Sequence, residues 1–314
     1  MASGEPSRPI PLQRRPLLLD THGYTDIKDP CPVELDGEWH LFGTGAHAGY
    51  RYDILHATAT NPAGPWRLRP PSVLPDIAGT CVAAPGVIAD GGLLHMFLQT
   101  EYNLFDGVVE HLISEDRGET FTHHDTALVS VPGTEEAGIY DPHPAELHGR
   151  RYLVYSGFAA IGRPDLFLAR STSGRWDGPW QRLGCILRHE DVPGHNQHDD
   201  PAYEWGLEGG QLIELPDGRI LLNAVCFLGG APAGDRQRVF FGLATDPEGP
   251  YAVTGPALHP AHGVGEVGHA AAVVHDATLA LFFQERTATG PWHYALATAQ
   301  VTQRDEAEEA EEAA

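Results

Sequence analysis

The chain has 314 residues, of which 42% are hydrophobic, and it carries a formal net charge of −23. This charge argues against a nucleic-acid or anionic-membrane partner, because such partners attract basic surfaces. The 36 glycines and 26 prolines are spread along the chain, which indicates many short strands separated by turns and disfavours long helices. The composition favours one all-β domain.

The two ends of the chain show no targeting or membrane segment. The N-terminal stretch MASGEPSRPIPLQRRPLLLD lacks the apolar core of a secretory signal, and no apolar run reaches the ~20 residues that span a bilayer. We therefore expect a cytoplasmic protein with no membrane partner. The last stretch, 303–314, mixes acidic residues with alanine and is expected to be a disordered tail after a single domain at 1–302.

One pattern recurs five times along the chain. Each copy begins with a small or acidic residue, reaches an apolar residue four positions later, passes a turn at Gly or Asp, and enters a strand of aromatic and β-branched residues. The spacing of the copies is roughly 55 to 67 residues, slightly longer than that of common propeller repeats. The copies begin at Asp29 (DPCPVELDGEWHLFGTG), Ala84 (APGVIADGGLLHMFLQTE), Asp141 (DPHPAELHGRRYLVYSGF), Glu208 (EGGQLIELPDGRILLNAVCF) and His269 (HAAAVVHDATLALFFQER).

The first four copies are each followed by a third strand and a turn that ends on an aromatic residue, at Trp66, Phe121, Trp180 and Tyr251. Five such repeats predict a five-bladed β-propeller with four antiparallel strands per blade, because ring closure removes exposed sheet edges. The fifth copy ends before its outermost strand, so we expect the N-terminal segment, around 16–19, to complete that blade. A β-sandwich with accidental repeats is the less favoured alternative.

The first strand of every propeller blade lines the central axis, so the five starting positions are expected to meet there. Asp-Pro alone is more often a turn than a catalytic site, but here Asp29, Asp141 and Glu208 take the same place in the repeat, together with His269. Like charges held together raise one another's pKa. Glycoside cleavage uses this arrangement, since one carboxylic acid protonates the leaving oxygen while a carboxylate activates water or attacks the sugar.

The order of these motifs resembles the five-bladed glycosidases of glycoside hydrolase family 43, over residues 25–300. The resemblance implies an inverting mechanism with Asp29 as general base, Glu208 as general acid and Asp141 as the residue that orients and modulates the acid. It implies that His269 lies on the axis near a structural calcium or sodium ion, held through water, and that Arg286 contacts the substrate. No cofactor is required, and the substrate is expected to be an oligosaccharide or small glycoside resembling an arabinofuranoside or xyloside.

The blade-two motif departs from the family pattern. Family members usually carry Trp there, whereas Cys81 to Ala84 precede Pro85 in this chain. The expected aromatic platform for the sugar is therefore missing or supplied by another part of the chain.

The segment GHNQHDDPAYEWGLEGG, which precedes the fourth copy, adds alternatives. Glu204 competes with Glu208 for the role of acid, although the strand residues that follow Glu208 favour the latter. Trp205 is a candidate stacking surface for a sugar ring. His198 is a candidate substrate contact, and together with His195 and either Asp199 or Asp200 it also forms a candidate metal site, for which a solvated loop is the commoner alternative.

Two other functions fit parts of the sequence. Residues 114–121, SEDRGETF, match the Asp-box turn of sialidases, but the motif occurs once and is expected to close a hairpin in blade two. A propeller that binds a ligand or catalyses a biosynthetic rearrangement in the same pocket is a second alternative to hydrolysis. The missing Trp and the absence of a secretory signal favour it.

Overall fold

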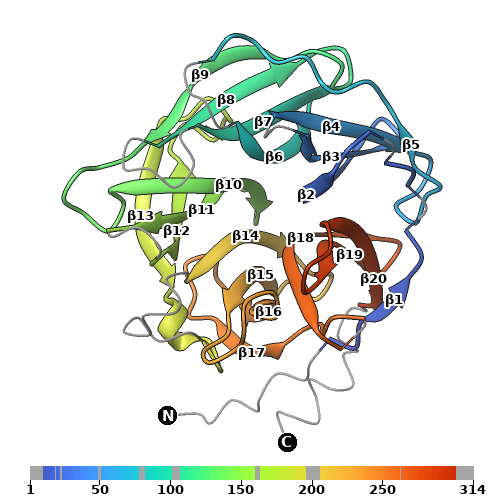
Figure 1. The fold of residues 1–314 in the computed structure, drawn as a ribbon. Coiled ribbons are helices and arrows are strands. Elements are labelled where there is room, and N and C mark those ends of the chain that lie inside the picture. The colour runs from blue at the N-terminus through green and yellow to red at the C-terminus, as the bar shows by residue number, and fades with distance from the viewer. Residues whose placement is uncertain are drawn as a thin grey trace, which may run out of the picture.

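The computed structural model describes residues 10–17, 19–21, 23–48, 51–77, 82–100, 107–159, 163–195, 206–261 and 263–301. In these residues the chain forms five four-stranded antiparallel sheets arranged around a central axis (Figure 1). The helical content of the same residues is a single 3-10 turn, His189–Asp191. The predicted five-bladed β-propeller is confirmed. None of the helices in the described part of the chain is long and apolar enough to cross a membrane.

The blades follow one another around the ring in chain order (Figure 1). Blade one contains β2 (Asp26–Leu35), β3 (Glu38–His47), β4 (Arg51–Ala59) and β5 (Arg67–Leu68). Blade two contains β6 (Ala83–Asp90), β7 (Leu93–Thr100), β8 (Val108–Ser114) and β9 (Thr122–Val129). Blade three contains β10 (Gly138–Leu147), β11 (Arg150–Phe158), β12 (Asp165–Ser171) and β13 (Trp180–Leu187).

The last two blades differ in how they are completed. Blade four contains β14 (Leu207–Glu214), β15 (Ile220–Phe227), β16 (Gln237–Ala244) and β17 (Ala252–Pro256). Blade five contains β18 (Gly265–His275), β19 (Thr278–Thr287) and β20 (His293–Gln300), and its outermost strand is the N-terminal β1 (Gln13–Arg15). The ring is thus closed by pairing the start of the chain with its end.

The closing strand lies earlier than the sequence predicted. We expected it around 16–19, but the residues that pair with β20 are Gln13, Arg14 and Arg15. Pro16 has no backbone N–H to donate to a ladder. Leu17 and Leu19 instead pack against the apolar cluster between blades five and one.

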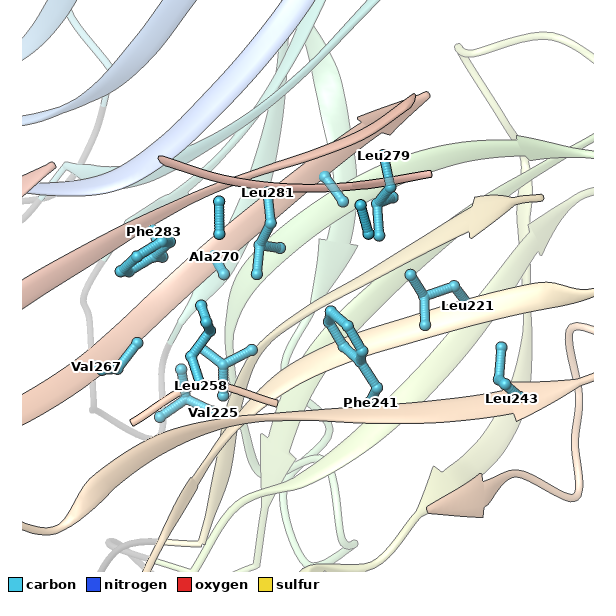
Figure 2. Packing of buried hydrophobic residues seen from close by; sticks show 14 of the residues in the cluster. Leu221, Val225, Phe241, Leu243, Leu258, Val267, Ala270, Leu279, Leu281 and Phe283 are labelled. Carbon is cyan, nitrogen blue, oxygen red and sulfur yellow. The ribbon is translucent and has the colours of Figure 1, made fainter. Parts of the chain in front are cut away.

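The hydrophobic core is divided into five clusters, one between each pair of neighbouring blades. Successive strand residues point to opposite faces of a sheet, and in a propeller both faces are covered. Phe282 and Phe283, both fully buried, therefore pack into different clusters, against blade one and blade four respectively. Figure 2 shows the cluster between blades four and five, which contains Phe283, Ala270 and Val225. Burying each such side chain contributes about 1.5–3 kcal/mol.

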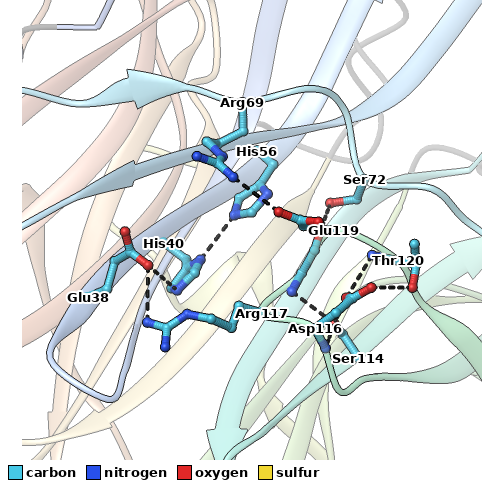
Figure 3. Close-up of polar contacts among 11 residues, drawn as sticks. Glu38, His40, His56, Arg69, Ser72, Ser114, Asp116, Arg117, Glu119 and Thr120 are labelled. Atoms are coloured by element: carbon cyan, nitrogen blue, oxygen red, sulfur yellow. Dashed lines mark hydrogen bonds and ion pairs between the residues drawn. The ribbon is translucent and has the colours of Figure 1, made fainter.

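The Asp-box motif closes the turn between β8 and β9, as expected. Thr120 donates its backbone N–H and its hydroxyl to the two carboxylate oxygens of Asp116, at 2.9 and 2.6 Å. The Gly118 N–H donates to Ser114 Oγ at 2.8 Å. Figure 3 shows this turn against blade one, where Arg117 forms an ion pair with Glu38 at 3.0 Å. The motif has a structural role at the seam between blades one and two.

Candidate functional site

The innermost strand of every blade contains a β-bulge at the same place. In blade one, Lys28 pairs with Thr44 and Cys31 pairs with Phe42, so two inner-strand residues, Asp29 and Pro30, face one residue of the second strand. The other four inner strands shift register in the same way. A bulge re-aims the side chains around it. Here it brings side chains from separate blades to the axis.

The bulges correct the predicted alignment of the repeats. Asp29 and Asp141 both take the first bulge position, with φ of 57° and 50°. Glu208 lies one position earlier, as the last paired residue before its bulge, and Gly209 takes the first bulge position with φ of 60°. His269 takes the second bulge position of blade five. The expectation that all four residues occupy the same position of the repeat was therefore wrong by one residue in blades four and five.

The four residues nevertheless meet. His269 Nδ1 lies 2.9 Å from Asp29 Oδ1, and His269 Nε2 lies 3.3 Å from Asp141 Oδ2 and 3.4 Å from Glu208 Oε1. The side chains of the three acids are at most 12% exposed. The imidazole thus lies between carboxylates from three other blades.

This arrangement gives the two aspartates opposite protonation behaviour. Burial alone raises the pKa of Asp29, but the charge and hydrogen bond of His269, together with the Lys28 charge and a hydrogen bond from Thr44, outweigh burial and lower it to about 2. Burial and the nearby Glu208 and Asp29 charges together raise the pKa of Asp141 to about 7, although His269 opposes them. The charges of Asp141 and Asp29 also raise the pKa of His269 well above its ordinary value, against the effect of burial. These shifts favour an ionised Asp29, a protonated imidazole and a proton on Asp141 near neutral pH.

Backbone hydrogen bonds between blades hold the two aspartates in place. The Asp29 N–H donates to Gln284 Oε1 of blade five at 2.8 Å, and the Asp141 N–H donates to Gln99 Oε1 of blade two. The Gly209 N–H of blade four donates to Asp141 Oδ2 at 3.2 Å. A left-handed backbone costs a non-glycine residue on the order of 1–3 kcal/mol, and these contacts keep the strained conformation in place.

Lys28 is a site residue that the repeat pattern did not identify. It occupies the same strand position in blade one as Glu208 does in blade four. Its Nζ lies 5.7 Å from the centroid of the Tyr52 ring. Burial lowers its pKa, but the charges of Asp29, Tyr52, Glu208 and Asp141 raise it above the ordinary value. The one available sequence signal was a lysine directly before the first Asp-Pro.

A pocket with about 310 Å³ of empty space, partly open to solvent, runs along these bulges. All five blades contribute to its lining, which includes Asp29, Asp141 and His269. Ala84 takes the bulge position of blade two, with φ of 51°, and leaves that side of the pocket without a charged group.

Arg286 is paired with an acid that does not belong to the axial cluster. Its guanidinium donates two hydrogen bonds to Glu266 Oε2, at 2.9 and 2.5 Å, and lies 4.5 Å from the centroid of the Trp292 ring. It is not among the residues that line the pocket. Its contact with substrate stays a prediction.

Several predicted residues lie outside the described part of the chain. They are Glu204, the alternative acid; Trp205, the candidate stacking residue; His198, the candidate substrate contact; Cys81, at the start of the blade-two motif; and the acidic tail 303–314. Glu208 itself belongs to the axial cluster, which favours it as the acid.

The fold matches those of known glycoside hydrolases. A thermostable family-43 glycoside hydrolase has a TM-score of 0.69 at 16% identity, covering 92% of this chain and 94% of that chain. A family-62 α-L-arabinofuranosidase from Coprinopsis cinerea has a TM-score of 0.67 at 15% identity, covering 93% and 97%. An endo-arabinase from Bacteroides thetaiotaomicron has a TM-score of 0.67 at 13% identity, covering 89% and 95%.

No protein-family model and no curated protein sequence matches the chain. At these identities the structural similarity shows the fold alone. The chain therefore shares the five-bladed propeller of glycoside hydrolases, and its activity must be argued from the axial cluster.

Proposed function

We propose that the protein is a glycoside hydrolase that acts at the propeller axis by an inverting mechanism. The observation that carries the proposal is the meeting of Asp29, Asp141 and Glu208 around His269. Burying an ionised group costs on the order of several kcal/mol, so such a cluster is expensive for the fold. Glycoside hydrolysis needs two carboxyl groups in opposite protonation states, which this cluster supplies.

Asp29 acts as the general base in this mechanism. Its pKa of about 2 keeps it ionised, so it can accept a proton from the attacking water. The raised pKa of Asp141, about 7, keeps a proton on this carboxyl group near neutral pH. Glu208 acts as the general acid that protonates the glycosidic oxygen, and Asp141 positions Glu208 and modulates it.

The separation of the acid and the base supports inversion. Asp29 and Glu208 contact different nitrogens of the His269 ring, so the ring separates the two carboxylates. Inverting enzymes hold their carboxyl groups about 6.5–9.5 Å apart to admit a water, whereas retaining enzymes hold them about 5–5.5 Å apart. Because an imidazole ring lies between Asp29 and Glu208, their separation agrees better with that of inverting enzymes.

The substrate that we propose is an arabinofuranoside, a xyloside or a related sugar. The similar structures include enzymes named arabinofuranosidase and endo-arabinase. A further one, an α-L-arabinofuranosidase from Podospora anserina, is in complex with cellotriose; it has a TM-score of 0.63 at 14% identity and covers 93% of this chain and 98% of that chain. The negative charge of −23 agrees with a neutral rather than an anionic substrate.

The axial residues do not fit a direct calcium or sodium ligand set. Calcium takes about 6–8 oxygen ligands. The axial residues that could hold an ion together are Asp141, Glu208 and His269, which offer two carboxylates and one nitrogen donor. A protonated His269 has no lone pair to donate and already supplies a positive charge between the carboxylates. An ion held through water stays a proposal. Activity and thermal stability that are unchanged by a chelator and by added calcium would count against it.

A non-hydrolytic pocket is the second candidate. The observation that favours it is that His269 contacts all three acids, so the cluster can also serve as a closed polar core beneath a ligand site. In that case replacing Asp29 or Glu208 would change ligand binding or stability, and no sugar would be released.

The deciding experiment measures turnover of a panel of nitrophenyl glycosides and arabinan or xylan oligosaccharides. We expect hydrolysis of at least one of them, with inversion at the anomeric carbon in a proton NMR time course. Asp29→Ala and Glu208→Ala should lose this activity, whereas Glu146→Ala, on the exposed face of the same strand as Asp141, should keep it. No release of sugar from any substrate would overturn the proposal.

A further inference from the structure

Blades one and two contain the same buried pair of histidines away from the axis. In blade one, His40 Nδ1 lies 3.0 Å from His56 Nε2. In blade two, His95 Nδ1 lies 2.9 Å from His111 Nε2. Each pair joins the second strand to the third and stacks against a Phe two positions after its first histidine. The two blades thus provide an internal comparison.

The outermost strands next to these pairs differ in charge. In blade one the neighbour is Arg69, whose backbone N–H donates to the carbonyl of His56 at 2.9 Å. The Arg69 guanidinium forms an ion pair with Glu119 at 3.1 Å (Figure 3). In blade two the corresponding place holds His124 and Asp125. Where blade one has the positively charged guanidinium of Arg69, blade two therefore has an imidazole and a carboxylate, which can bind a cation.

A β-bulge directs both groups of blade two toward the buried pair. His111 pairs with Asp125 and Leu112 pairs with His123, so His124 is the extra residue of β9. In a regular strand His124 and Asp125 would point to opposite faces. The bulge sets both of them against one partner residue, His111.

The resulting geometry suits a transition metal. His111 Nδ1 lies 3.1 Å from Asp125 Oδ1, and the His111 and His124 rings are 5.1 Å apart at 72°. One ligand atom from each of the three residues lies within 4.8 Å of the others. Zinc bonds of about 2.0–2.1 Å place two ligand atoms of a tetrahedral site about 3.3 Å apart, close to the His111–Asp125 distance.

We propose that His111, His124 and Asp125 form a zinc site on the outer part of blade two, with solvent at the fourth position. Two imidazoles and one carboxylate are donors that zinc accepts readily. His111 Nδ1 is the ligand atom, and its Nε2–H donates to His95 Nδ1. This outer contact fixes the tautomer and orientation of the ligand, as is common for metal-bound histidines.

The site gives β9 an anchor that its apolar contacts do not provide. Among its eight residues Leu128 alone is buried, and most of the others are exposed. A metal bound by His111 of β8 and by His124 and Asp125 of β9 ties the outermost strand to the blade. We therefore assign the site a structural role, separate from the axial chemistry.

The test uses the full chain without an affinity tag, stripped with a chelator and titrated with zinc chloride. We expect wild type to bind zinc at this site and to melt at a higher temperature with zinc than without. His124→Ala and Asp125→Asn should each weaken the affinity for zinc more than about 100-fold, since loss of an outer-shell contact alone costs about 10–100-fold. His123→Ala is the matched control, because it neighbours His124 but faces Glu110 at 3.0 Å.

Cobalt gives a second readout. Cobalt in place of zinc should show the visible absorption of a tetrahedral ion in wild type and in His123→Ala, and lose it in His124→Ala. Glycoside turnover should be unchanged in His124→Ala, so the two proposals can fail separately.

Three outcomes would overturn the zinc site. The first is that wild type binds no zinc, and the second is that wild type and His124→Ala bind zinc with equal affinity. The third is that His124→Ala keeps its zinc, while the double variant His195→Ala with His198→Ala, or the variant Glu208→Gln, loses it. This third outcome would place the metal in the His-rich segment or at the axis.

Discussion

His269 Nδ1 lies 2.9 Å from Asp29 Oδ1, and this contact joins the last blade of the propeller to the first at the axis. The same ring faces Asp141 and Glu208 through its other nitrogen. One protonated imidazole therefore compensates the charges of acids from three blades. Its position makes the protonation of the cluster and the stability of the ring depend on each other.

Replacing His269 by Gln should weaken the protein in a defined pH window. The depressed pKa of Asp29 contributes stability above about pH 4 that is lost as the pH falls through about 2. The raised pKa of His269 contributes stability below about pH 6.5 that is lost as the pH rises through its folded value. We expect His269→Gln to lose about 2 kcal/mol between these limits in urea unfolding. His148→Gln, a control at an exposed histidine, should not lose stability in this window. If His269→Gln lost the same free energy of unfolding at all pH values, the loss would not come from these ionic interactions.

The acid and the base should be distinguishable by leaving group. Glu208→Ala removes the proton donor, so substrates with poor leaving groups should lose about 10²–10⁴-fold in kcat/KM and nitrophenolate substrates much less. Asp29→Ala removes water activation and should slow all substrates alike. Equal losses across leaving groups for Glu208→Ala would disagree with its role. The measurement is kcat/KM on a series of aryl glycosides with graded phenol pKa.

Asp141→Asn should change the pH profile as well as the rate. The wild-type cluster retains a proton up to about pH 7, because burial and the neighbouring acids raise the pKa of Asp141. We expect kcat/KM of wild type to fall above about pH 7 and that limb to move to lower pH in the variant, since one like charge is gone. Wild-type stability should decline as pH rises from about 4 to 7, because the native state releases this proton later than the unfolded chain. A variant that keeps the same decline would show that another group binds the proton.

The sequence was sufficient for the fold because the propeller repeats itself. Five copies of one strand pattern gave the number of blades, and their starting residues gave the neighbourhood in which Asp29, Asp141 and Glu208 meet. The alignment failed by one residue for Glu208 and His269, because spacing alone does not show whether the residue that faces the axis lies directly before the bulge or at its first or second position.

Lys28 could not be predicted in the same way. A lysine before a turn motif is usually solvated, and the raised pKa of this one depends on the charges of Tyr52 from another strand and of acids from two other blades. The closing strand ends at Arg15, since Pro16 has no backbone N–H to donate to a ladder and Leu17 and Leu19 pack into the cluster between blades five and one. Both features depend on contacts between blades, which no single repeat contains.

Gly209→Ala should damage the site through His269. A Cβ at Gly209 would lie 2.9 Å from His269 Cγ, closer than real side chains approach, and φ there is +60°. Gly218→Ala is the matched control in the same blade, with φ of +78° and nothing within 4 Å of the added Cβ. Both variants should lose about 1–2 kcal/mol from backbone strain. We expect a fall of at least about 10-fold in kcat for Gly209→Ala alone, and similar rates in both variants would mean that His269 tolerates displacement.

Arg14→Ala should open the ring at its closing strand. The Arg14 guanidinium donates to both carboxylate oxygens of Glu285, at 2.9 and 2.8 Å, and to the carbonyl of His259 at 2.7 Å, and it lies 5.0 Å from the centroid of the Phe283 ring. Because Arg14 is partly exposed, we expect a loss of about 1–2 kcal/mol in urea unfolding rather than the full value of a buried charged pair. Arg15 donates exposed hydrogen bonds to the Thr298 hydroxyl and to Gln13 Oε1, both at 3.2 Å, and Arg15→Ala should lose less than about 0.5 kcal/mol. Amide exchange of β20 should accelerate in Arg14→Ala alone, because β20 becomes an edge strand whenever β1 detaches; unchanged exchange there would mean that the pairing of β1 with β20 does not depend on this ion pair.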